Sequence, residues 1–184
     1  NKYKTKIKIS KNINSYKKIA KLLFENKIIA RCCENSEWGA RALGNRSILC
    51  RPDKLENINL LNKAIKQRDF WMPFSPVILE KYYKNFIINK KNIPPYFMSV
   101  AFDTVEKNRD KIIASIHPID HTARPQVVNN NNNFELFKLL SEFYKVSKIP
   151  CLLNTSFNLH GEPIVETPFD ALRVFFLSKI DVLV

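Results

Sequence analysis

Short apolar runs alternate with longer amphipathic segments along most of this 184-residue chain. Apolar runs of four to eight residues bounded by polar or turn residues are typical of buried strands, and apolar residues spaced three and four apart are typical of helices. The alternation predicts an α/β fold in which helices pack against a sheet. Strands are predicted within 28–33, 73–79, 96–102, 111–117, 149–158 and 181–184. Helices are predicted within 15–27, from about Lys54 to 67, within 134–147 and within 167–179.

The length fits about one domain, since roughly 150 residues is a typical domain size. We place that domain at 15–184. Residues 1–14 mix basic and small apolar residues and read as a leader, a linker or an edge strand. The chain has no initiator Met, so we expect it to begin within a longer protein.

Composition excludes several classes of protein. A hydrophobic fraction of 45% and a charged fraction of 26% match a soluble globular domain. The sequence contains no run of 18 apolar residues, the length needed to span a bilayer. The first 30 residues contain no hydrophobic core of a signal peptide. The four cysteines (Cys32, Cys33, Cys50 and Cys151) are too few for a disulfide framework, so we expect a reducing cytoplasm.

The net charge of +13 is typical of proteins that bind nucleic acid or phosphate. Only eight of the 30 basic residues are arginine, and the many lysines fit a general Lys, Asn and Ile bias. The positions of the arginines are therefore more informative than the net charge.

A first polar cluster lies between two of the three glycines, Gly39 and Gly44. Arg41 and Arg46 stand five apart, with Asn45 beside the second, and a guanidinium fork suits a phosphate or a carboxylate. A local salt-bridge network with Glu34 and Glu37 is the alternative interpretation.

In a second cluster, Lys66 and Arg68 stand two apart before Phe70, Trp71 and Phe74. In an extended stretch both cations share one face and could reach one anion. Basic residues that complement a helix C-terminus give the same pattern, so this cluster alone is weak.

The third and fourth clusters each follow a predicted strand, where open α/β sheets place ligand sites. The third favours a hydrogen-bonded substrate site over a zinc site or an ordinary loop, and it holds His117, Asp120, His121, Thr122, Arg124 and Gln126. The fourth holds Asn154, Thr155, Ser156 and Asn158 before a turn at Gly161, an arrangement that suits an anion or a nucleotide. Neither a GxSxG elbow nor a GxxxxGK[ST] loop is present.

Four segments then resemble one family when taken together. EWGARALGNRSIL (37–49), IKQRDFWMPFSPVIL (65–79), IHPIDHTARPQ (116–126) and IPCLLNTSFNLHGEPIVETPFDALRVF (149–175) occur in the order and spacing of one known domain. It is the C-terminal domain of the NodU/CmcH/TobZ carbamoyltransferases, and the resemblance runs from about Ser15 to Val184. It implies a YrdC-like α/β fold, an open twisted mixed sheet packed by helices.

The resemblance implies an ATP-dependent O-carbamoyltransferase. Such enzymes form carbamoyl-adenylate from ATP and carbamoyl phosphate and pass the carbamoyl group to a sugar or natural-product hydroxyl. Mg²⁺ is expected with the nucleotide, and no metal ligands are assigned in this chain. An N-terminal actin/Hsp70-like acceptor domain, in cis or in trans, is the implied partner, whereas a membrane is not expected and nucleic acid is disfavoured.

The resemblance also implies the site. Lys66 and Arg68 look like the Lys-x-Arg signature of YrdC-like domains, and they join Arg124 as the candidate catalytic residues. The other candidate substrate-binding residues are Arg41, Asn45, Arg46, His117, Asp120, Thr122, Asn154, Thr155, Ser156 and Asn158.

One departure stands out. Where the family usually has GRMEWGPRALGNRS, this chain has Glu34-Asn35-Ser36 before Glu37, so a Gly-Arg pair is missing. Two alternatives therefore stay open, a non-catalytic scaffold and an RNA-binding YrdC-like module.

Overall fold

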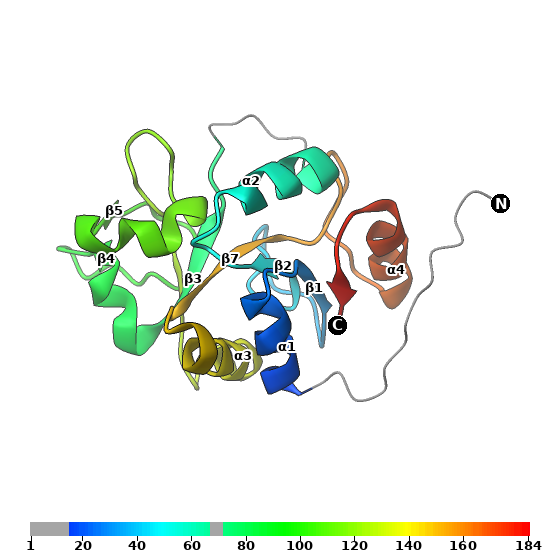
Figure 1. The fold of residues 1–184 in the computed structure, drawn as a ribbon, viewed down its shortest axis with the longest axis horizontal. Coiled ribbons are helices and arrows are strands. Elements are labelled where there is room, and N and C mark those ends of the chain that lie inside the picture. Colours follow the sequence, from blue (N-terminus) through cyan, green and yellow to red (C-terminus); the bar gives the residue numbers. More distant parts are fainter. Residues whose placement is uncertain (1–14, 67–71) are drawn as a thin grey trace.

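The computed structural model describes residues 15–66 and 72–184. The interpretation of residues 1–14 as a leader, linker or edge strand lies outside these ranges, as does the candidate Arg68. Figure 1 shows a central sheet with helices on both sides.

The main sheet has six strands in the order β6-β3-β7-β2-β1-β8. Its central strand β7 (Cys151–Ser156) pairs antiparallel with both β2 (Arg46–Cys50) and β3 (Ser75–Leu79). Two further pairs are parallel: β3 with β6 (Gln126–Val128), and β1 (Ile29–Cys32) with β8 (Val182–Leu183). The sheet is thus mixed, and the predicted α/β class is confirmed.

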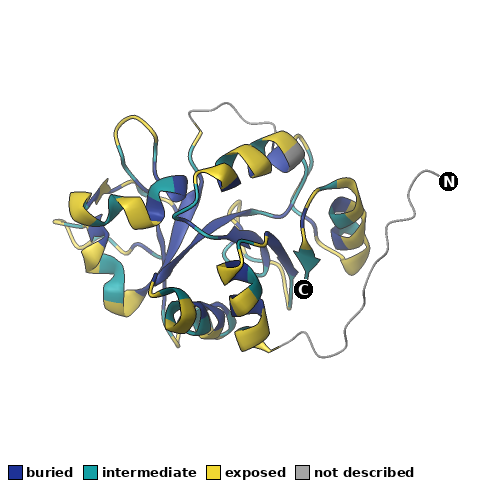
Figure 2. Ribbon diagram, in the orientation of Figure 1, coloured by how far each residue is buried: buried dark blue, intermediate teal, exposed yellow. Residues whose placement is uncertain are grey.

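Helices bury both faces of this sheet. α1 (Tyr16–Phe24) and α3 (Phe134–Ser147) pack on one face in a core with Ile29, Leu49 and Leu152. α2 (Glu56–Leu61) and α4 (Pro168–Leu177) belong to a second core with Ile48 and Leu153. Strand β7 is buried between the two layers, as Figure 2 shows.

Two helix starts follow from local chemistry. At α4 the Thr167 side chain accepts from the Asp170 N–H, and the Asp170 carboxylate accepts from the Thr167 N–H, so the predicted cap is confirmed. The Asn133 side chain caps α3 by accepting from the Leu136 N–H. Ser15 occupies the predicted N-cap of α1 but its side chain makes no capping hydrogen bond.

The predicted helix after Lys54 is α2, which continues into a π-helical turn, η1 (Asn62–Lys66). The turn carries Lys66 at its end.

Two strand predictions were wrong. Residues 111–117 fall largely in the 3-10 helix η3 (Glu106–Ser115), because an apolar run of this length fits a strand and a short buried helix equally well. Residues 96–102 form no strand beyond a single bridge between Phe102 and Ala123. Strands β2 and β6 were not predicted.

The remaining elements form a small lobe beside β3: the 3-10 helix η2 (Glu80–Asn85) and a two-stranded sheet of β4 (Ile87–Ile88) and β5 (Asp103–Thr104). In the described part of the chain, no helix is long and apolar enough to cross a bilayer.

Candidate functional site

A loop between β1 and β2 is folded around one carboxylate. Oε1 of Glu37 accepts hydrogen bonds from the backbone N–H groups of Leu43 (2.8 Å), Asn45 (2.6 Å) and Arg46 (3.3 Å). The Asn45 side chain donates to the Asn35 carbonyl. Glu37 therefore serves the backbone of the loop, and no ion pair joins it or Glu34 to an arginine among the described residues. The predicted salt-bridge alternative was wrong.

Arg46 is buried at 6% exposure, and its hydrogen-bonding capacity is used within the protein. Its guanidinium donates to four backbone carbonyls, those of Cys33 (2.7 Å), Glu34 (2.9 Å), Asn45 (3.2 Å) and Glu166 (3.0 Å). The sequence suggested a phosphate or a carboxylate for this guanidinium, but backbone carbonyl oxygens accept its hydrogen bonds. Arg46 therefore acts as a clasp between the loop and the segment before α4.

Lys66 joins the end of β7 to the π-helical turn. Lys66 is 2% exposed, and its ammonium donates to the Ser156 carbonyl (2.5 Å), the Ser156 Oγ (3.0 Å), and the Asn158 Oδ1 (2.5 Å) and carbonyl (3.1 Å). The Ser156 hydroxyl also donates to Asn158 Oδ1, at 2.7 Å. The structure thus brings together Lys66, Ser156 and Asn158, three of the residues that the sequence proposed.

A hollow of about 60 Å³ opens beside these residues, above the ends of β3 and β7. Arg41 and Arg124 both line it, and neither guanidinium has a hydrogen-bond or ion-pair partner within the described ranges. Burial, followed by the positive charge of Arg41, lowers the pKa of Arg124 below its ordinary value. Other lining residues are Ala40, Ala42, Pro73, Phe74, Ser75, Met98, Asn154, Thr155 and Ser156.

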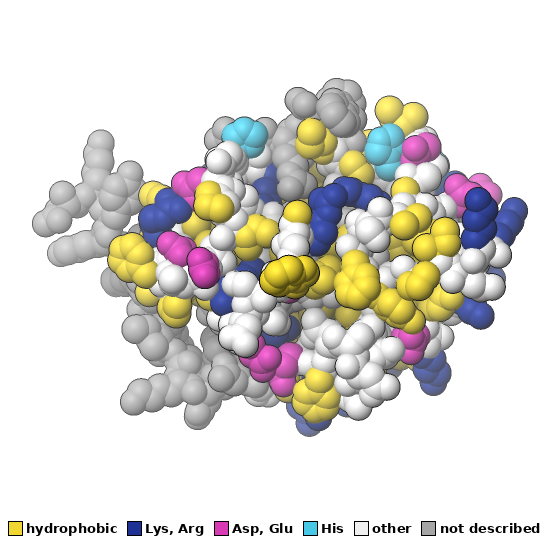
Figure 3. Space-filling model, turned by 180° about the vertical axis from the view of Figure 1, so that it is seen from behind, with side chains coloured by type: hydrophobic (Ala, Val, Ile, Leu, Met, Phe, Trp, Pro, Cys, Tyr) yellow, Lys and Arg dark blue, Asp and Glu magenta, His cyan; other side chains and the backbone are white. Residues whose placement is uncertain are grey.

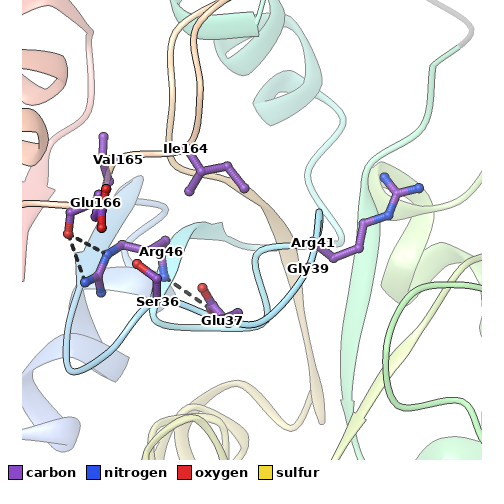
Figure 4. A pocket seen from close by; sticks show the side chains of 8 residues that line it. All are labelled: Ser36, Glu37, Gly39, Arg41, Arg46, Ile164, Val165 and Glu166. Atoms are coloured by element: carbon purple, nitrogen blue, oxygen red, sulfur yellow. Dashed lines mark hydrogen bonds between the residues drawn. The ribbon is translucent and has the colours of Figure 1, made fainter.

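A second hollow of about 210 Å³ adjoins the first through Arg41. Figure 4 shows its lining: Arg46 turns toward Glu166, while the Arg41 side chain is directed away from Arg46. The two arginines of the first predicted cluster are therefore separated by role. Of these two arginines, only Arg41 remains available to a ligand. Figure 3 shows basic side chains gathered beside a hydrophobic band on one face of the molecule.

The third cluster divides in the same way. Asp120 Oδ1 accepts from the Thr122 N–H and hydroxyl, both at 2.8 Å, and His117 Nδ1 accepts from the Asp120 N–H at 3.3 Å. The hydrogen bonds from the Thr122 backbone and side chain lower the pKa of Asp120. These three side chains stabilise their own turn and do not line either hollow, so only Arg124 of the cluster reaches the candidate site.

Sequence reasoning missed some site residues. Ser75 lines the first hollow and lies opposite Asn154 across β3 and β7. Its signal was a lone hydroxyl at the start of an apolar strand. Gln126, a member of the third cluster that was not among the candidate site residues, supports Asn154 from β6.

Comparison with known proteins identifies the family. The family model described as Carbamoyltransferase C-terminus matches residues 20–184. The chain belongs to this carbamoyltransferase family. Among the family members, Nodulation protein NolNO of Sinorhizobium fredii is 38% identical over 152 residues, which cover 81% of this chain and 22% of that protein. Uncharacterized protein MJ1051 of Methanocaldococcus jannaschii is 39% identical over 165 residues, which cover 90% of this chain and 31% of that protein.

The carbamoyltransferase domain thus spans about a third or less of these two relatives. Its fold is YrdC-like, as the resemblance implied. Full-length HypF in its phosphate- and nucleotide-bound form aligns with a TM-score of 0.68 at 16% identity, over 92% of this chain and 24% of that one. Escherichia coli YciO aligns at 0.64 and 11% identity, over 91% of this chain and 75% of that one.

Proposed function

We propose that this domain binds ATP and carbamoyl phosphate and forms carbamoyl-adenylate, which an acceptor domain then uses to carbamoylate a sugar or natural-product hydroxyl. The observation that carries the proposal is the pair Arg41 and Arg124. Two guanidinium groups that line one hollow, with no acidic partner among the described residues, repel each other, and a bound anion relieves that repulsion.

The proposed chemistry brings several negative charges together. Water first cleaves carbamoyl phosphate to carbamate and inorganic phosphate. A carbamate oxygen then attacks the α-phosphorus of ATP, a new P–O bond forms, and pyrophosphate leaves. The protein's task is to position the reactants and neutralise charge, so cations suit it better than a nucleophile.

Each cation has a part in this proposal. Arg41 and Arg124 bind phosphate oxygens in the hollow. Lys66 holds Ser156 and Asn158 at the end of β7, so these polar groups meet the nucleotide in fixed positions. Arg68, which lies outside the described residues, completes the Lys-x-Arg pair that the family resemblance assigns to the nucleotide.

Mg²⁺ enters this proposal with the nucleotide. The lining of the first hollow, as described, holds no carboxylate, so the ion's ligands would be phosphate oxygens and water. The acceptor domain is proposed as a partner in cis or in trans. A cytoplasmic setting remains our prediction; the four cysteines are free thiols.

The test is release of pyrophosphate when the chain is mixed with ATP, Mg²⁺ and carbamoyl phosphate. We expect Arg124→Gln to lower the rate by roughly a hundredfold, because it removes a charge-assisted contact in a partly dry site. Lys66→Ala and Arg68→Ala should abolish it. Arg173→Gln is the matched control, since that arginine is paired with Glu162 on the surface outside the hollow.

Undiminished release by Arg124→Gln, Lys66→Ala and Arg68→Ala would overturn the site. Absence of any heat on titration with an ATP analogue would favour the scaffold alternative, and salt-dependent RNA binding at sub-micromolar affinity would favour the RNA-binding one.

A further inference from the structure

Two side-chain amides, those of Gln126 and Asn154, are hydrogen-bonded to each other, and Asn154 lines the first hollow. Backbone carbonyls fix the orientation of both amides. The Gln126 Nε2 donates to the Leu43 carbonyl at 2.6 Å, so its Oε1 points the other way. That Oε1 accepts from Asn154 Nδ2 at 3.0 Å, and the same Nδ2 donates to the Ala42 carbonyl at 3.1 Å. Because a carbonyl can only accept, neither amide can be turned over without losing these bonds.

In this orientation one acceptor, Asn154 Oδ1, receives no hydrogen bond from the described residues. Asn154 is 1% exposed, and its Oδ1 is buried without a hydrogen-bond partner in the described structure. A buried amide oxygen with no donor is destabilising, because it has lost its hydrogen bonds to water and gained none in return. Asn154 lines the hollow together with Arg41 and Arg124. The residue that carries the unpaired acceptor therefore borders the same space as two arginines that have no partner among the described residues.

Asn57 provides an internal comparison. It is also fully buried, its Nδ2 also donates to two acceptors (Asn26 Oδ1 and the Arg51 carbonyl), and its Oδ1 also lacks a partner in this part of the chain. Asn57 lines neither hollow described above. The property that distinguishes Asn154 is therefore its place in the cation-lined cavity.

We infer that Asn154 Oδ1 accepts a hydrogen bond from the amino group of the carbamoyl moiety and so selects carbamoyl phosphate over other acyl phosphates. The inference rests on the proposed function and assigns the specificity of its site. A ligand for this hollow needs phosphate oxygens for Arg41 and Arg124 and an N–H donor for Asn154. Carbamoyl phosphate carries both groups, whereas acetyl phosphate has a methyl group in place of the donor.

Such a site rejects the analogue strongly. When acetyl phosphate occupies the hollow, the methyl group covers Oδ1 without a hydrogen bond, and the acceptor stays unpaired. We expect the wild-type chain to bind carbamoyl phosphate roughly tenfold to a hundredfold more tightly than acetyl phosphate.

The experiment is isothermal titration of the chain with carbamoyl phosphate, acetyl phosphate and inorganic phosphate. In Asn154→Leu the ratio between the two acyl phosphates should fall to within about threefold of one, while affinity for inorganic phosphate changes little because both arginines remain. The matched control, Asn57→Leu, should keep the wild-type ratio. Thermal melting of both variants reports whether they are folded, and Asn154→Ser is the substitute if Asn154→Leu is not.

Equal affinity of the wild type for the two acyl phosphates would overturn the inference without any variant, and so would an unchanged ratio in a folded Asn154 variant. Both results leave the proposed function intact, because phosphate binding by the arginines is then still observed. Failure of all three ligands to bind the wild type removes the proposed function, and the inference with it.

Discussion

Two groups of cations near the end of β7 are held in opposite ways. Arg46 and Lys66 are nearly inaccessible, and protein oxygens accept their N–H groups. Arg41 and Arg124 line a hollow and have no such partners within the described residues. A basic residue in a motif can therefore either hold the site together or bind the ligand. The number of protein hydrogen-bond partners distinguishes these two roles, whereas the residue type does not.

The largest expected effect is a loss of stability when Arg46, one of the two inaccessible cations, is replaced. Arg46→Met should lower the free energy of unfolding by about 3 kcal/mol, because it removes the charge-assisted hydrogen bonds of a buried guanidinium to several backbone carbonyls. Arg124→Met should change it by less than about 1 kcal/mol, because it removes a charge whose pKa shows that the fold disfavours it. Urea denaturation of both variants measures the difference. An equal loss in the two would erase the contrast.

A charge reversal at Arg41 tests the two cations that line the hollow. Arg124 has no carboxylate partner among the described residues, and Arg41→Glu replaces its repulsive neighbour with one, so the unfolding free energy should stay the same or rise by up to about 1 kcal/mol. Affinity for inorganic phosphate should fall by roughly a hundredfold or more, since one cation is lost and the other is occupied. Thermal melting and titration with phosphate give the two readings. Retained phosphate affinity would show that this hollow is not the anion site.

Two glycines allow a finer test of the loop. Gly44 has φ +129°, and a Cβ there would lie 2.8 Å from Leu136 Cδ2, so Gly44→Ala should cost about 2–3 kcal/mol. Gly39 has φ +94° but open space around it, so Gly39→Ala should cost about 1 kcal/mol of backbone strain alone. Denaturant midpoints of the two variants check the order, and a costlier Gly39→Ala would contradict the packing.

The smallest expected effect lies outside both cation groups. Thr167→Ala removes the N-cap of α4 and should cost about 1 kcal/mol at neutral pH, while both cation groups keep their roles. Lys179→Ala, at an exposed position just beyond the other end of α4, is the control.

The same cap carries a pH dependence. Hydrogen bonds from the Thr167 backbone N–H and hydroxyl lower the pKa of Asp170 below its ordinary value. The stabilisation is therefore present above the unfolded pKa of an Asp, about 4, and is lost as the pH falls through the lower folded value. The difference between wild type and Thr167→Ala should shrink under acid, as stability measured against pH will show.

Local chemistry explains why part of the fold could be predicted. The helix at Phe134–Ser147 and the cap at Thr167 depend on neighbours three and four residues away, which the sequence displays. β2 was missed because its first residues, Arg46 and Ser47, are polar, and their burial depends on strands far away in the chain. The run at 111–117 was misassigned because its apolar residues bury equally well in a 3-10 helix.

The candidate site was predicted in composition but not in arrangement. The sequence placed Lys66, Ser156 and Asn158 in one site, and the structure brings them into contact. It could not separate Arg41 from Arg46, because the oxygens that saturate Arg46 are backbone carbonyls, which every residue type carries. His117, Asp120 and Thr122 looked equally suitable, yet their short spacing lets them hydrogen bond to one another.

The carbonyl of Leu43 has a consequence for how the chain assembles. It accepts from Gln126 and from Asn133, residues 83 and 90 positions further along the chain. Contacts at such separations close large loops and form slowly, after local helices are in place. The hollow should therefore take shape only once β6 and α3 have docked, so we expect a nascent or partly folded chain not to bind the proposed ligands. Ligand binding by this domain is thus expected to report complete folding.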